Sequence, residues 1–136
     1  MKRLLLSAAT VLFLTACSSG ADLAAAKKAV DQFHAELNAG QFGRIQAESS
    51  PEWKQASSPA DTIQLFTGVR KKLGNFVSGQ EGDWRVNFGT GGTIIMLQYK
   101  SKFQKSDAVE TFTYRRSGDG VQLVGYNINS RALITG

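Results

Sequence analysis

The chain has 136 residues, of which 42% are hydrophobic, with 16 lysines and arginines against 11 aspartates and glutamates. It has one cysteine and one histidine, which excludes an intrachain disulfide and any metal site built from several cysteines or histidines. We therefore expect no metal and no cofactor.

The N-terminus has the parts of a secretory signal peptide. Met1-Lys2-Arg3 is basic, residues 4–14 are mostly apolar, and small residues precede Cys17. A helix over residues 4–14 would be about 16 Å long, roughly half of the ~30 Å hydrocarbon core of a bilayer. The pattern therefore favours a cleaved signal over residues 1–16 rather than a membrane span.

The end of this segment, Leu14-Thr15-Ala16-Cys17, resembles the bacterial lipobox, whose cysteine is lipidated and becomes the new N-terminus. The resemblance implies a lipoprotein of the bacterial cell envelope that is anchored to the membrane through Cys17. Ser18 is similar to the sorting signal of outer-membrane cargo, which implies the periplasmic face of that membrane in a Gram-negative host. An exported domain does not meet cytoplasmic nucleic acid, so we expect no nucleic-acid partner despite the net charge of +5.

After cleavage the chain divides into two parts. Residues 17–22 are predicted to be the lipidated cysteine and a short polar tether. Residues 23–136 are predicted to fold as a single domain, since their number suits one hydrophobic core.

Apolar spacing predicts helices in the first half of this domain. Asp22 is the expected N-cap of the first helix, and Gly40 its end. The buried stripe of this helix recurs at three- and four-residue steps: Leu23, Ala26, Val30, Phe33 and Leu37. Its Glu36 lies off this stripe and is expected to face water.

Two more helices are expected at Ser50-Pro51 and Ser58-Pro59, each an N-cap followed by proline at the first helical position. Trp53 should point inward from the first of them. The second should end before Gly74, and its predicted stripe is Ile63, Phe66, Val69 and Leu73.

From residue 75 onward the apolar period becomes two, which is typical of strands. Strands are expected around residues 84–88, with Trp84 on the buried face, and over residues 93–104, 108–116 and 121–128.

Turn lengths predict the register of these strands. A three-residue turn over 118–120, with Gly120 left-handed, would pair Phe112 with Tyr126 and Tyr114 with Val124. An even-length turn at Ser106-Asp107 would pair Tyr99 with Tyr114.

Helices followed by consecutive strands predict an α+β domain, in which N-terminal helices pack on a curved antiparallel sheet of about four strands. This order resembles the nuclear-transport-factor-2-like (cystatin-like) cone. Three stretches are similar to bacterial families of unknown function that share this fold and occur in exported lipoproteins: residues 69–74, the pair Phe103 and Glu110, and Gly125-Tyr126-Asn127-Ile128. The resemblance implies a fold and a location in the cell envelope, but it implies no catalysed reaction.

The candidate site residues border the space between the first helix and the sheet. His34 is expected either as a half-buried structural histidine or as a titrating group that points into a pocket. Tyr99, Tyr114 and Tyr126 would either fill the core or line a pocket with His34. The sequence shows no nucleophile–base pair and no paired carboxylates, so we assign no catalytic residue.

These observations favour a noncatalytic binding or interaction module for a small apolar ligand, a peptide or another envelope protein. One alternative is a small enzyme of the isomerase or dehydratase kind, which would use the tyrosines with His34, Asp31 or Glu110. The other alternative is a purely structural envelope assembly protein. An open cone of several hundred Å³ would favour binding or catalysis, whereas a cone filled by aromatic side chains would favour a structural role.

Overall fold

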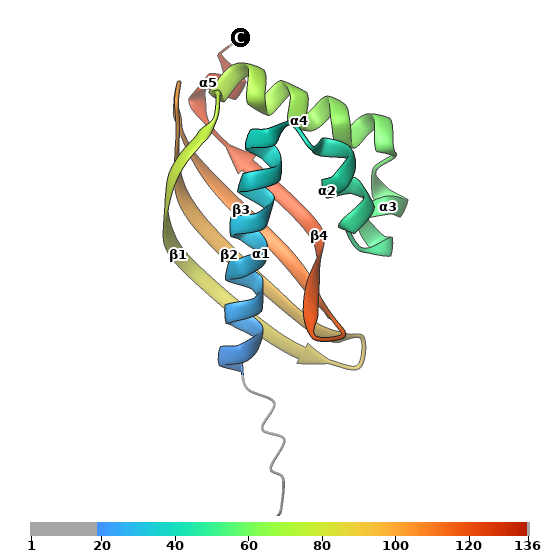
Figure 1. The fold of residues 1–136 in the computed structure, drawn as a ribbon. Coiled ribbons are helices and arrows are strands. Elements are labelled where there is room, and N and C mark those ends of the chain that lie inside the picture. Colours follow the sequence, from blue (N-terminus) through green and yellow to red (C-terminus); the bar gives the residue numbers. More distant parts are fainter. Residues whose placement is uncertain (1–18, 136) are drawn as a thin grey trace, which may run out of the picture.

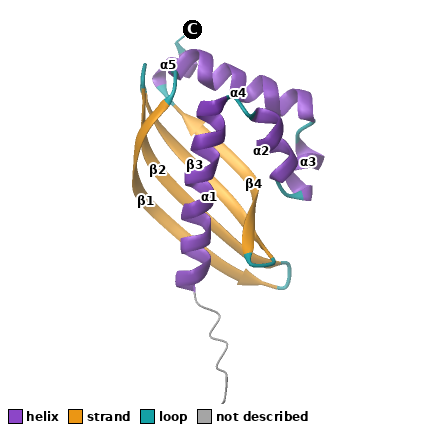
Figure 2. Ribbon diagram, viewed as in Figure 1, coloured by secondary structure: helices purple, strands orange, loops and turns teal. Residues whose placement is uncertain are grey.

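The computed structural model describes residues 19–135, so the predicted signal peptide and Cys17 lie outside the described residues. In this range, helices α1 to α4 precede a sheet, and the short helix α5 follows it (Figures 1 and 2). The elements are α1 (Ser19–Ala39), α2 (Phe42–Glu48), α3 (Pro51–Ala56), α4 (Pro59–Leu73), β1 (Phe76–Gly89), β2 (Gly92–Phe103), β3 (Asp107–Ser117), β4 (Gly120–Asn129) and α5 (Arg131–Ile134).

The sheet is antiparallel with the strand order β1-β2-β3-β4. It is curved and unclosed, and α1 runs along its inner face (Figure 1). The predicted α+β class, with helices on one face of a four-stranded curved sheet, is therefore confirmed.

Local sequence signals explain where the helices begin and end. The Ser50 hydroxyl accepts a hydrogen bond from the Trp53 amide, and Ser58 forms a capping box with Asp61, as expected for N-caps followed by proline. Gly74 ends α4 with a φ of 77°, a conformation that favours glycine. In the described range, no helix is both long and apolar enough to span a membrane.

Three expectations about the helices are wrong, and the structure has two helices beyond those expected. Asp22 is not an N-cap, because α1 already includes Ser19; the Asp22 side chain instead pairs with Arg116. Glu36 is buried rather than solvated, with 7% of its surface exposed. In α4, Ile63 is 43% exposed, and Thr62 takes its place in the core. The short helices α2 and α5 were not predicted.

The register of β3 and β4 combines a shorter turn with a bulge. Phe112 pairs with Tyr126 as predicted, but Tyr114 pairs with Leu123, not with Val124. The turn has two residues, since Ser117 pairs with Gly120, and Gly118 rather than Gly120 has a positive φ of 57°. The bulge next to Tyr114 adds Val124 to β4 as an extra residue. From Thr113, which pairs with Gly125, the strands therefore follow the predicted register.

The predicted pairing of Tyr99 with Tyr114 is also wrong. Tyr99 lies opposite Glu110, and Tyr114 lies opposite Ile95. The two tyrosines still share the inner face of the sheet, because side chains on one face recur every second residue.

Trp84 does not belong to the core. Trp84 and Phe88 are each 55% exposed, although both share the inner face of β1 with the partly buried Val86. Since β1 is an edge strand, the helical layer leaves its far half uncovered. The alternation of apolar and polar residues correctly assigned Trp84 to the inner face of β1. It could not show whether a helix covers that part of the face.

Candidate functional site

Aromatic rings fill the space between α1 and the middle of the sheet. The ring of Phe33 lies 5.4 Å from Phe66, 5.1 Å from Phe112 and 4.9 Å from Tyr126, measured between ring centroids. Such edge-on and tilted contacts are typical of packed cores. The centre of the cone is therefore filled, which favours a structural role for the cone itself and means that a binding role depends on a different pocket.

A fully buried carboxylate, Glu110 on β3, lies beside this core. The Ser101 hydroxyl donates a 2.6 Å hydrogen bond to its Oε1, and the Tyr126 hydroxyl donates a 2.6 Å hydrogen bond to its Oε2. The Nε2 of His34 lies 2.8 Å from Oε1. These contacts connect α1 with β2, β3 and β4, and supply the partners that a buried carboxylate needs.

His34 is buried between α1 and the sheet. It is 5% exposed, and its ring stacks on Phe76 with centroids 3.5 Å apart and planes at 4°. The structure thus makes His34 a core residue that is bound to Glu110. Burial, and then the Glu110 carboxylate, raise the pKa of Tyr126 well above its usual range.

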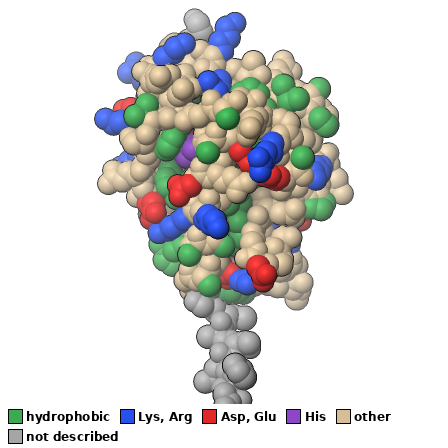
Figure 3. All heavy atoms as spheres, viewed as in Figure 1, with side chains coloured by type: hydrophobic (Ala, Val, Ile, Leu, Met, Phe, Trp, Pro, Cys, Tyr) green, Lys and Arg blue, Asp and Glu red, His purple; other side chains and the backbone are tan. Residues whose placement is uncertain are grey.

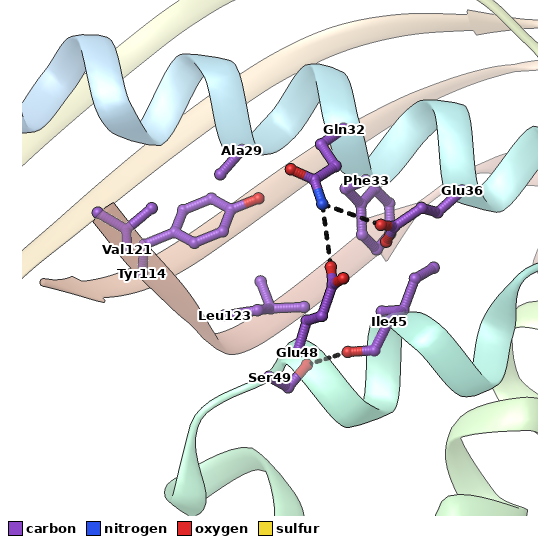
Figure 4. Close-up of a pocket in the computed structure, with 10 residues that line it drawn as sticks. All are labelled: Ala29, Gln32, Phe33, Glu36, Ile45, Glu48, Ser49, Tyr114, Val121 and Leu123. Carbon is purple, nitrogen blue, oxygen red and sulfur yellow. Dashed lines mark hydrogen bonds between the residues drawn. The ribbon is translucent and has the colours of Figure 1, made fainter. Parts of the chain in front are cut away.

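A separate pocket lies between α1, α2 and the β3–β4 side of the sheet (Figure 4). We call it the side pocket; its volume is about 270 Å³. Its lining residues are Ala29, Gln32, Phe33, Glu36, Ile45, Glu48, Ser49, Tyr114, Val121 and Leu123. Of the four predicted pocket residues only Tyr114 lines it, whereas His34, Tyr99 and Tyr126 do not.

The hydroxyl of Tyr114 is buried and has no hydrogen-bond partner within residues 19–135. Figure 4 shows this side chain pointing toward Gln32 on α1. Burial raises the pKa of Tyr114 well above its usual range, with Tyr99 and Glu110 adding to the effect. A neutral phenol hydroxyl that lacks a partner in a pocket can bind a ligand.

Two carboxylates form the polar wall of the side pocket. The Gln32 amide donates 3.0 Å hydrogen bonds to both Glu36 and Glu48 (Figure 4). From outside, the Nε of Arg44 lies 2.8 Å from Glu48 and 3.3 Å from Glu36. Burial raises the pKa of Glu36, an effect that Gln32 and Arg44 oppose and Glu48 reinforces.

The sequence interpretation missed this polar wall. Glu36 was placed in solvent, and Glu48 belongs to a helix that was not predicted. The four-residue spacing of Arg44 and Glu48, which form an ion pair, was an available signal for a helix.

A larger hollow of about 890 Å³ crosses the outer face of the sheet near α5. Its border includes the cations Lys100, Lys102 and Arg131, and the anion Asp107. Within residues 19–135, the buried polar side-chain atoms that lack a hydrogen-bond partner lie outside it. The side pocket, which has such a group, is therefore the better candidate site.

Comparison of the chain with protein-family models gave no match, and comparison with curated proteins gave none either. In the described part of the chain, no group of three or more His, Cys, Asp or Glu side chains is placed to hold a metal ion.

Proposed function

We propose that this chain is a lipid-anchored protein of the bacterial cell envelope, and that its folded domain is a noncatalytic binding module. The anchor rests on the lipobox-like sequence at Cys17. The binding role rests on the side pocket. The observation that carries it is the buried, unpartnered hydroxyl of Tyr114, which lines that pocket.

The lining of the side pocket defines the class of ligand. Glu36 and Glu48 contribute two carboxylates against the one guanidinium of Arg44, so the wall favours a cationic or hydrogen-bond-donating group. Apolar side chains from the sheet and helices form the remainder, which suits a short hydrocarbon portion. A volume of about 270 Å³ lies just below the common range for ligand sites, about 300–1,000 Å³. The ligand is therefore a small amine or an amine-bearing side chain of a peptide.

The position of Tyr114 supports binding rather than catalysis. Its hydroxyl is neutral at ordinary pH, as that of any tyrosine is, and burial raises its pKa further, so it donates or accepts a hydrogen bond and does not act as a base. The side chains of His34 and Glu110 are buried outside this pocket and are hydrogen-bonded to each other.

A ligand-observed NMR screen tests this proposal. The probes are small aliphatic and aromatic primary amines, each with the alcohol of the same carbon skeleton as its control. We expect amines to bind and the matched alcohols to bind more weakly, because only the amines carry a charge that complements Glu36 and Glu48.

Two variants assign the binding to the side pocket. Glu48→Gln removes one carboxylate while keeping a side chain of the same shape, and it should weaken amine binding. Lys100→Gln, on the outer face of the sheet, should leave it unchanged. Equal binding of amines and alcohols, or equal binding by wild type and Glu48→Gln, would contradict the proposed site.

A further inference from the structure

One end of the domain exposes large apolar side chains. Trp84 and Phe88 lie on the same face of β1 and are each 55% exposed, with the partly buried Val86 between them. Leu23 in the first turns of α1 is also partly buried. Hydrophobic side chains are visible at the surface at this end in Figure 3.

These aromatic residues lie at the end where α1 enters the domain. An ion pair of 2.6 Å between Lys27 and Glu81 holds α1 beside β1. From this pair, α1 runs back to Ser19 over about 12 Å. A bulge between Glu81 and Trp84 adds a residue to β1, so the strand advances about 7 Å to Trp84 and about 20 Å to Phe88. Figure 1 shows that the first turn of α1 and the β1–β2 hairpin lie at the same end.

The sequence places the anchor at this end as well. Cys17 precedes Ser19 by two residues, a connection of about 7 Å at most. A lipid on Cys17 would therefore hold the membrane surface close to the first turn of α1. The β1–β2 hairpin, which directly follows Phe88, lies about level with that turn (Figure 1), and Trp84 precedes Phe88 on the same strand.

We propose that Trp84 and Phe88 enter the interfacial layer of the membrane that holds the Cys17 lipid. Aromatic side chains are favoured at that depth, because one part of the ring is apolar and, in tryptophan, the N–H finds a polar partner. The contact adds a second attachment point and holds the domain in one orientation. This inference rests on the proposed lipid anchor.

The charges at this end indicate which lipids matter. Asp83 and Arg85 flank Trp84 with opposite signs, so the contact does not depend on an anionic surface. We expect it to form on vesicles of zwitterionic phosphatidylcholine.

The two tryptophans of the chain allow a direct test, because Trp53 is buried at 6% exposure whereas Trp84 is exposed. The lipidated full chain is reconstituted into phosphatidylcholine vesicles with or without brominated acyl chains, which quench nearby tryptophans. We expect bromine to quench wild-type fluorescence. It should leave Trp84→Phe, in which Trp53 is the remaining tryptophan, unquenched.

The mass of the purified protein separates the two proposals. A lipidated protein whose Trp84 is not quenched would overturn the membrane contact and leave the anchor in place. A protein without lipid would overturn the anchor, and the contact with it. If Trp84 is unquenched and Trp84→Phe shifts the sedimentation of the protein from dimer to monomer, a second copy covers this surface, and the inference is wrong.

Discussion

The Tyr126 hydroxyl donates a 2.6 Å hydrogen bond to Oε2 of Glu110, a carboxylate with no exposed surface. The Tyr114 hydroxyl, on the same face of the sheet, is buried without a partner within residues 19–135. The two phenols are chemically identical, but one is paired with a carboxylate in the core and the other lacks a partner in the described part of the chain.

Replacement of each tyrosine by phenylalanine should separate these roles. Tyr126→Phe leaves a buried carboxylate oxygen without its donor, so the free energy of unfolding should fall by about 1–3 kcal/mol. Tyr114→Phe removes a hydroxyl that is buried without a partner, so stability should change by less than about 0.5 kcal/mol or rise. Urea unfolding of both variants measures the difference. Equal losses would mean that both hydroxyls are structural.

A second pair of variants tests the corrected core. Phe66→Ala should cost about 3–5 kcal/mol, because Phe66 is fully buried and its removal leaves a cavity. Trp84→Ala should cost less than about 1 kcal/mol, because Trp84 is 55% exposed. The same urea experiment measures both. A loss at Trp84 as large as that at Phe66 would show that Trp84 is packed in the folded domain.

Alkaline titration should show delayed ionisation of every tyrosine. Burial raises the pKa of Tyr99 to about 12, and those of Tyr114 and Tyr126 well above their usual range. The unfolded chain titrates near pH ~10, so these groups contribute stability that is present below that pH and lost as pH rises through the folded pKa values. We expect tyrosinate absorbance to stay low between pH ~10 and ~12 and to rise together with loss of circular dichroism. Early titration of a folded protein would contradict this burial.

The anchor prediction concerns Cys17. In a bacterial host, radiolabelled palmitate should enter the wild type but not Cys17→Ala, and the variant should accumulate as precursor or as a soluble exported form. Stable anchoring needs more than one acyl chain, which the lipobox modification supplies. Label in Cys17→Ala, or no label in the wild type, would contradict lipidation.

Local signals predicted most of the fold. Ser50 and Ser58 identified two helix starts because an N-cap followed by proline is a strong short-range signal. The change of apolar period from 3.6 to two located the sheet. The resemblance to nuclear-transport-factor-2-like domains remains a prediction.

The side pocket could not be predicted because its parts depend on tertiary contacts. Helix α2 has seven residues, and Gln41 makes no side-chain cap for it, so its start had no capping signal, although the spacing of Arg44 and Glu48 indicated a helix there. Without α2, Glu48 had no position and the contact of Glu36 with Arg44 could not be foreseen. The bulge beside Tyr114 also makes this residue pair with Leu123 instead of Val124. The alternation of apolar and polar residues gives no sign of such a bulge.

The most direct test of the central claim, that the side pocket binds a ligand through Tyr114, is calorimetric titration of wild type and Tyr114→Phe with the best amine from the screen. We predict that Tyr114→Phe weakens binding by about tenfold, the equivalent of one hydrogen bond at ~1.4 kcal/mol, while its melting temperature stays at or above that of the wild type. Unchanged affinity, or lower affinity together with a lower melting temperature, would contradict the claim.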